Sequence, residues 1–295
     1  MRLYQMQYIS DLRILSRCIS VNWSDLFLMK LFYRKYGYGP PLIILHGLFG
    51  SSDNWMTIAK SLGEYFTVYL PDQRNHGQSP HSNIGDYNSM RDDLLELAQD
   101  LNLKKFFLAG HSMGGKTAIS FALKWPEMIN GLLIADISPF INERSKDSAY
   151  NEHLNILEAM LSIDLSLVSS RKEVESILFE KIPSEQTRGF ILKNLQRTID
   201  NKFVWKINSP ALRSNLGNII EGIVLRGDLT QQISGFPVIF LKGEESDYLP
   251  SGDFKDIQSI FPAAEFVVVP NAGHWIHTDR PDEVIKNIKR LLLES

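Results

Sequence analysis

The stretch 106–116 constrains the fold of this chain more than any other, because an apolar run, a Gly-x-Ser-x-Gly pattern and a helical pattern follow one another in it. The mostly apolar residues from Phe106 predict a short buried strand, and residues 116–124 predict a helix. Gly110 and Gly114 flank Ser112, which leaves room for a strained turn that lifts the serine hydroxyl above the end of a sheet. Ser112 is therefore the candidate nucleophile.

Strand patterns alternate with helix patterns on both sides of this stretch. Strands are expected at 42–45, 66–70, 106–110, 132–135, 238–241 and 265–269, with an edge strand within 30–37. Helices are expected to end near Leu62, to run from Asp86 to Leu101, and to cover 116–124, 252–260 and 281–293. This alternation predicts an α/β fold whose mostly parallel central sheet is flanked by helices.

The alternation is interrupted between about residues 140 and 233. Helices are expected there near 149–161, 171–179, 185–198 and 211–219, and only 202–207 has an extended pattern. Helices inserted between two strands of a parallel sheet are interpreted as a lid over its C-terminal edge. Residues 29–295 are thus expected to form one domain with this lid, and residues 1–28 a loosely attached N-terminal extension without an assigned function.

Composition narrows the range of partners. The net charge is −3 and no dense basic run occurs, which argues against a nucleic-acid partner and favours a small-molecule substrate. No apolar run reaches the roughly 18 residues that a membrane span needs. Cys18 is the single cysteine, which is compatible with a reducing cytosol, so a cytoplasmic location is expected. The oligomeric state is not indicated.

A serine nucleophile needs a base and a group that orients this base. His274 is the candidate base, because it follows a late expected strand in a loop with Gly273; a structural pairing with Asp279 is the competing interpretation. The acid has two candidates. Asp136 ends the strand after the serine's helix, 136 − 112 = 24 residues on, and is favoured because neighbouring parallel strands end side by side. Asp247 is the weaker alternative.

Further roles are expected in the surrounding loops. The backbone N–H groups of Met113 and Leu48 are the candidate oxyanion hole, and their side chains would line the acyl site. The candidate substrate-binding residues are Phe49, His111 and Trp275. The run 74–79 is interpreted as a structural turn that braces the 46–50 loop, and no metal ligands are assigned.

The motifs together resemble the α/β-hydrolase superfamily, and within it the branch of YbfF-type esterases, acyl-CoA thioesterases and their animal relatives. They are His46-Gly47-Leu48-Phe49-Gly50, Arg74-Asn75-His76-Gly77, Gly110-His111-Ser112-Met113-Gly114-Gly115-Lys116, Asp136-Ile137-Ser138-Pro139 and Gly273-His274-Trp275-Ile276-His277. The resemblance implies hydrolysis of carboxylic esters or acyl thioesters without a cofactor. It also implies an acid at Asp136, since that branch similarly lacks the usual acid after Gly243.

The leading hypothesis is a serine hydrolase that acts on short to medium acyl esters or acyl-CoA thioesters. Arg144 and Lys146 are candidates to meet a phosphate-bearing leaving group, although a solvated surface explains them equally well. A lyase or C–C hydrolase, in which the serine assists proton transfer, is the alternative chemistry on the same scaffold. A non-catalytic binding module that has kept the fold is the third hypothesis.

Overall fold

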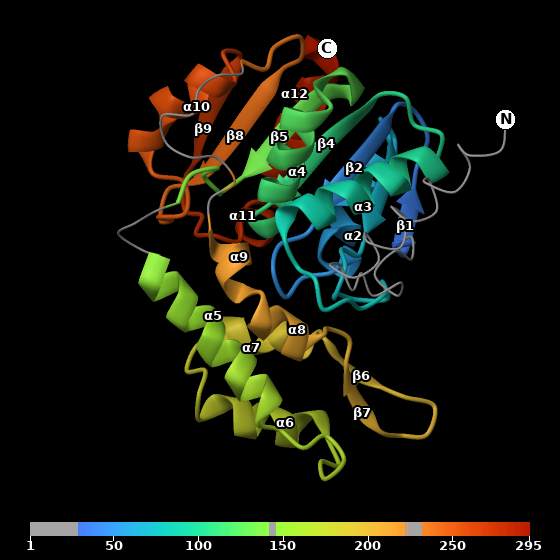
Figure 1. Ribbon diagram of the computed structural model, residues 1–295, viewed down its shortest axis with the longest axis vertical. Coiled ribbons are helices and arrows are strands. Elements are labelled where there is room, and N and C mark those ends of the chain that lie inside the picture. The colour runs from blue at the N-terminus through green and yellow to red at the C-terminus, as the bar shows by residue number, and fades with distance from the viewer. Residues whose placement is uncertain (1–28, 142–145, 222, 224–231) are drawn as a thin grey trace, which may run out of the picture.

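The computed structural model describes residues 29–141, 146–221, 223 and 232–295. A seven-stranded sheet forms its centre (Figure 1). In order across the sheet, the strands are β1 (Tyr33–Tyr36), β3 (Thr67–Pro71), β2 (Pro41–Leu45), β4 (Phe106–His111), β5 (Ile129–Ala135), β8 (Val238–Gly243) and β9 (Ala264–Val269). Only β1, at one edge, pairs antiparallel; all other pairs are parallel. The predicted mostly parallel sheet is confirmed.

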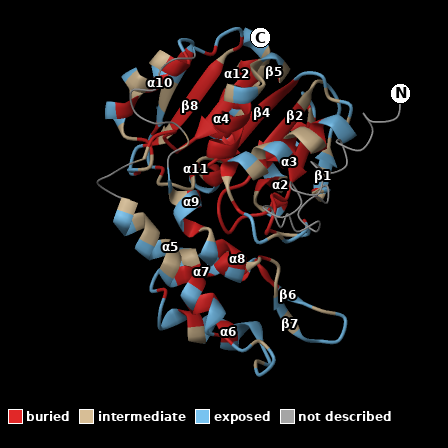
Figure 2. Ribbon diagram, viewed as in Figure 1, coloured by how far each residue is buried: buried red, intermediate tan, exposed pale blue. Residues whose placement is uncertain are grey.

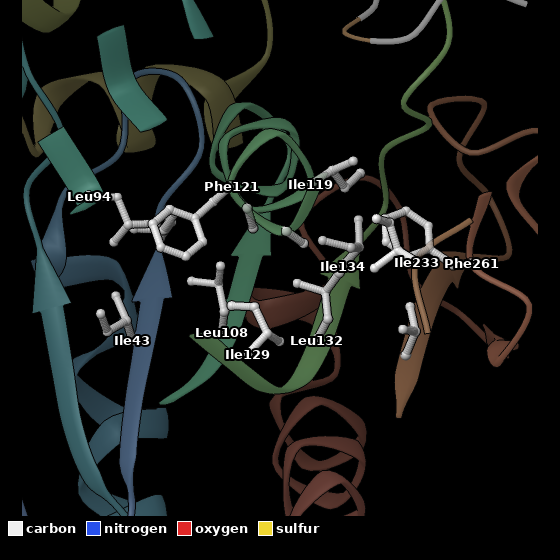
Figure 3. Packing of buried hydrophobic residues seen from close by; sticks show 14 of the residues in the cluster. Ile43, Leu94, Leu108, Ile119, Phe121, Ile129, Leu132, Ile134, Ile233 and Phe261 are labelled. Atoms are coloured by element: carbon white, nitrogen blue, oxygen red, sulfur yellow. The ribbon is translucent and has the colours of Figure 1, made fainter. Parts of the chain in front are cut away.

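The central strands are buried on both faces (Figure 2). Side chains alternate between the faces, so along β2 Ile44 packs on one side of the sheet and Ile43 on the other. One face is covered by α2 (Met56–Leu62) and α12 (Pro281–Glu294), and the other by α3 (Tyr87–Asp100), α4 (Met113–Lys124) and α10 (Phe254–Ile260). Figure 3 shows the second face, where Phe121 of α4 lies over Leu108 of β4. Such two-sided burial explains why the strands are apolar at nearly every position.

Helix α3 illustrates how local sequence sets an element's bounds. The Asp86 side chain accepts a hydrogen bond from the Ser89 N–H at 2.7 Å, which satisfies one of the free donors in the first turn. Leu94, Leu97 and Ala98 are then buried on one side of the helix. The helix predicted to be capped by Asp86 is therefore confirmed, and it ends within one residue of the expected position.

The segment between β5 and β8 forms a helical insertion, defined here as residues 146–220. It contains α5 (Lys146–Leu161), α6 (Arg171–Phe179), α7 (Glu185–Leu192), α8 (Ser209–Ser214), α9 (Leu216–Ile220) and the hairpin of β6 (Leu195–Arg197) and β7 (Phe203–Trp205). The insertion lies at one end of the sheet (Figure 1). Its apolar residues pack against Leu48, Phe49 and Met113, which belong to the loop after β2 and the start of α4.

One helix predicted in this insertion is wrong at its C-terminal end. The helix expected over 185–198 ends at Leu192, and Leu195–Arg197 instead pairs with Phe203–Trp205. The physical reason is tertiary. The buried Asn194 side chain donates to the Phe49 carbonyl at 2.8 Å, and the Asn194 carbonyl accepts from the Lys206 N–H at 2.8 Å, so the backbone turns away from the helix there.

Over the described ranges, no helix has the length and apolarity needed to cross a membrane. In that same part of the chain, no group of three or more His, Cys, Asp or Glu side chains is placed to hold a metal ion. Cys18, Arg144 and the expected extension 1–28 lie outside the described residues.

Candidate active site

Ser112 stands at the turn between β4 and α4 in a strained backbone conformation. Its φ is 52° and its ψ is −120°, a combination that non-glycine residues rarely adopt. The Ser112 N–H donates to the Ala135 carbonyl at 3.2 Å, and its carbonyl accepts from the Lys116 N–H at 3.0 Å. The turn needs glycine on both sides, because a Cβ at Gly110 would lie 2.3 Å from the Gly114 carbonyl oxygen. These contacts fix the serine at the tip of the turn.

His274 joins this serine to a carboxylate. Its Nε2 lies 3.0 Å from Ser112 Oγ, and its Nδ1 lies 2.8 Å from Asp136 Oδ2. The loop after β9 carries His274, and the Tyr248 ring stacks on the imidazole with centroids 3.7 Å apart. Asp279 does not take this place, since its carboxylate accepts from the Gly273 N–H instead. The structure thus brings together the serine, histidine and aspartate that the sequence favoured.

Asp136 is fully buried at the end of β5, where its own φ is 51°. Its Oδ1 accepts from the Gly243 N–H at 2.9 Å, and its Oδ2 accepts from the Ser246 hydroxyl as well as facing His274. Two hydrogen bonds from the β8 end therefore hold this carboxylate against the imidazole. Asp247, the alternative acid, is exposed, and the Nδ1 of His274 lies against Asp136.

The expected bracing turn contacts the loop after β2 directly. Arg74 donates to both carboxylate oxygens of Asp93, at 2.6 and 2.7 Å, in a buried pair. The His76 Nε2 accepts a hydrogen bond from the Phe49 N–H at 3.3 Å, while its Nδ1–H donates to the Arg74 carbonyl at 2.9 Å. Burial lowers the pKa of His76 to about 3, which keeps the ring neutral and its Nε2 free to accept.

Two cavities meet at Ser112. The inner cavity has a volume of about 60 Å³, and its lining is largely apolar: Leu48, Met113, Ile137, Phe140, Ile219 and Ile220, with Lys116 and Lys146 also present. The outer cavity has a volume of about 720 Å³ and includes Phe49, His111, Glu152, Glu245, His274, Trp275 and Asp279. Ser112, Leu48, His153 and Tyr248 line both. The serine hydroxyl therefore stands where a small, largely apolar space opens into a larger one with a mixed polar and apolar lining.

The chain matches a model of the alpha/beta hydrolase fold over residues 40–281. It belongs to the α/β-hydrolase family. The sn-1-specific diacylglycerol lipase ABHD11 of Danio rerio is 36% identical over 258 residues, covering 85% of this chain and 78% of that protein. Esterase YbfF of Escherichia coli is 29% identical over 254 residues, covering 85% and 92%. A solved structure described as a marine microorganism esterase is 43% identical with a TM-score of 0.84, covering 89% and 99%.

These comparisons confirm the family resemblance, the fold and the hydrolase class that the motifs predicted. In this α/β-hydrolase, the three candidate substrate-binding residues, Phe49, His111 and Trp275, all line the outer cavity. His111 also has a supporting contact, because its Nε2–H donates to the His274 carbonyl at 2.7 Å. Burial lowers the pKa of His111 well below its ordinary value, so the ring that supports this loop is neutral.

Several residues at the hydrolase site were not singled out from the sequence. The sequence offered a signal for Ser246, because it occupies the position after Gly243 where an acid is common. Its contact with Asp136, however, is visible only in the folded structure. His153 had none: it comes from the insertion, lines both cavities, and has a buried Nδ1 without a hydrogen-bond partner in the described structure. Lys146 lines the inner cavity and not the outer one.

Proposed function

We propose that this hydrolase cleaves carboxylic esters of short to medium acyl chains, with Ser112 as nucleophile, His274 as base and Asp136 as orienting acid. The proposal is carried by one observation, the continuous line of hydrogen-bond contacts from Asp136 Oδ2 through the imidazole to Ser112 Oγ. A serine hydroxyl is a poor nucleophile by itself, and a base held in this geometry removes its proton as it attacks.

The reaction has two stages. Ser112 Oγ attacks the ester carbonyl carbon while its proton passes to Nε2 of His274; the bond to the alcohol oxygen then breaks, and the alcohol leaves with that proton. Water next attacks the acyl-serine, its proton passes to His274, and the acid leaves as the serine is restored. The buried Asp136 carboxylate accepts from Nδ1–H and stabilises the imidazolium formed in each stage.

Two backbone N–H groups are proposed to stabilise the oxyanion, those of Met113 and Leu48. Met113 is the first residue of α4, where N–H groups and the helix dipole favour negative charge. The loop of Leu48 lies directly against the serine, since a Cβ at Gly47 would be 3.2 Å from Ser112 Cβ. The Phe49 N–H is already bonded to His76, which leaves the Leu48 N–H as the donor proposed from this loop.

The two cavities suggest how the ester is divided. The small, largely apolar inner cavity suits the acyl chain, and the larger outer cavity suits the alcohol. The outer lining contains the carboxylates of Glu152, Glu245 and Asp279 and, among the described residues, neither lysine nor arginine. A phosphate-bearing leaving group such as coenzyme A would meet like charges there. An uncharged alcohol is therefore favoured over an acyl-CoA thioester.

The test compares p-nitrophenyl butyrate with butyryl-CoA and adds a fluorophosphonate that traps serine nucleophiles. We expect ester hydrolysis, an adduct on Ser112 by mass spectrometry, and loss of both in Ser112→Ala. Ser61→Ala, which changes an exposed serine on α2, is the matched control and should retain both. A higher kcat/KM for butyryl-CoA than for the ester would contradict the proposed leaving group.

The same experiment separates the other two hypotheses. A lyase or a C–C hydrolase that uses the serine only for proton transfer forms no acyl-serine, so the absence of any covalent intermediate in quenched reactions would favour it. A binding module would show no turnover that depends on Ser112.

A further inference from the structure

Lys116 places a buried amine in the wall of the inner cavity. It lies on α4 one turn after Ser112, and the residue is only 5% exposed. Buried lysines are ordinarily paired with a carboxylate, because burial disfavours the charged form. Nζ of Lys116 makes its hydrogen bonds to backbone carbonyl oxygens at the C-terminal end of the helical insertion, and the Glu221 carboxylate is a nearby opposite charge.

The carbonyls in question belong to the C-terminal end of α9. Nζ donates to the carbonyls of Ile220 at 2.9 Å and Glu221 at 2.6 Å, and lies 3.4 Å from that of Ile219. The last carbonyls of a helix have no partner within the helix, and a cation near them also interacts favourably with the helix dipole. The ammonium group of Lys116 thus acts as a C-terminal cap supplied by another helix.

Tyr87, at the start of α3, adds a second contact to the same point. Its hydroxyl donates to the Ile219 carbonyl at 2.7 Å, and Nζ of Lys116 lies 5.6 Å from the centre of its ring. Two helices that pack on the sheet therefore hold the end of α9 through side chains. Neither contact involves Ser112, His274 or Asp136.

These contacts fix one wall of the inner cavity relative to the other. Ile219 and Ile220 of α9 line the cavity on the insertion's side, while Met113 of α4 and Ile137 after β5 line it from the sheet. The space between them is small, with a volume of about 60 Å³. Its width depends on the position of the end of α9, to which Lys116 and Tyr87 are both hydrogen-bonded.

We propose that Lys116, assisted by Tyr87, is a positioning residue that sets the acyl-chain length accepted by this hydrolase. This inference rests on the proposed function, because it takes the inner cavity as the acyl site. The three ammonium N–H groups face three carbonyls, so the amine has no donor left for a substrate carboxylate. Burial lowers the pKa of Lys116 to about 7, the direction expected for an amine removed from water.

The test measures kcat/KM for p-nitrophenyl esters from acetate to decanoate in Lys116→Met and Tyr87→Phe. Methionine keeps an unbranched side chain, one atom shorter than that of lysine, but removes the donors. We expect the preference to move to longer chains, with a gain of up to about fourfold for each extra methylene group that the widened cavity buries. Tyr87→Phe should shift the profile in the same direction by less. Lys124→Met, an exposed lysine on the same helix, should leave the profile unchanged.

A proportional fall for all chain lengths in Lys116→Met, with the preference unmoved, would overturn the inference while leaving ester hydrolysis intact. A second readout does not depend on turnover. The melting temperatures of the Ser112→Ala variant and of the Ser112→Ala, Lys116→Met double variant are measured with fatty acids of increasing length. The longest acid that stabilises the protein should be longer in the double variant, and equal lengths would also overturn the inference. If Lys116→Met does not fold, Tyr87→Phe decides by the same two criteria.

Discussion

The hydroxyl of Ser246 donates a hydrogen bond to the same carboxylate oxygen of Asp136 that faces His274. Asp136 follows β5 and Ser246 follows β8, which are neighbouring parallel strands. The carboxylate and the group that holds it are thus supplied from two strands. A carboxyl group buried completely in this way is cut off from water, so these donors supply the hydrogen bonds that water would otherwise make.

Replacement of Ser246 by alanine should weaken this support without disturbing the cavity. The Asp136 carboxylate would retain the Gly243 N–H and His274 but lose a donor, so we expect kcat to fall about tenfold, the equivalent of one hydrogen bond, with little change in KM. Steady-state kinetics with p-nitrophenyl butyrate measure both. Ser246→Thr keeps the hydroxyl and should restore most of the activity; an unaffected Ser246→Ala would show that the contact is dispensable.

Asp136→Asn and Asp247→Asn should have very different effects. An amide at position 136 cannot accept and orient the imidazole N–H as the carboxylate does, so kcat should fall by about 10³–10⁴. Asp247→Asn changes an exposed side chain, and kcat should stay within about twofold of wild type. The assignment of the acid fails if the larger loss occurs at position 247.

Gly114→Ala should damage both stability and activity. A Cβ there would lie 2.5 Å from the carbonyl oxygens of Leu45 and His46, and the backbone must shift to relieve the contact. We expect a loss of about 1–3 kcal/mol in the free energy of unfolding, measured by urea denaturation, together with a large fall in kcat. Gly189→Ala on α7 is the control, since no atom lies within 4 Å of its added Cβ, and it should be neutral or slightly stabilising.

The buried His277 should make the protein less stable in mild acid. Burial lowers its pKa from 6.5 to about 3, so between these values the unfolded chain binds a proton that the folded chain does not. Its contribution is intact above pH 6.5 and declines as the pH falls, by about 2 kcal/mol at pH 5. His277→Phe preserves the stacking shape against Trp55 and should reduce the stability difference between pH 7 and pH 5 by that amount.

Urea denaturation at the two pH values measures this difference. His81→Phe, at an exposed position, is the matched control and should leave the difference as it is in wild type. An unchanged difference in His277→Phe would mean that another group is responsible for any loss of stability in acid.

The sheet and two residues of the candidate site could be predicted because their signals are local. A strand, a glycine-flanked serine and a helix occupy consecutive positions around Ser112, and His274 lies in the loop directly after a strand. The acid was harder to predict, because the choice between Asp136 and Asp247 depends on which strand ends beside the imidazole. That in turn depends on the order of strands in the sheet, which no local pattern records.

The insertion shows a second limit. The end of α7 was predicted wrongly because Asn194 is held by the Phe49 carbonyl, 145 residues away in sequence. Lys116 gave no signal for a similar reason, since the carbonyls that it contacts lie 103 to 105 residues further along the chain. Periodicity describes how a segment could fold alone, whereas these positions are decided by partners more than 100 residues away in the sequence.

The pairing of β4 with β5 places His111 opposite Ala135, so Ser112 and Asp136 are the residues directly after two strands that lie side by side. Nucleophile and acid therefore share one rigid support, while His274 is attached through a separate loop beyond β9. Of these three residues, His274 is the one whose side chain can move without breaking the pairing of β4 with β5. On mild heating, this enzyme should lose its activity before the central sheet unfolds.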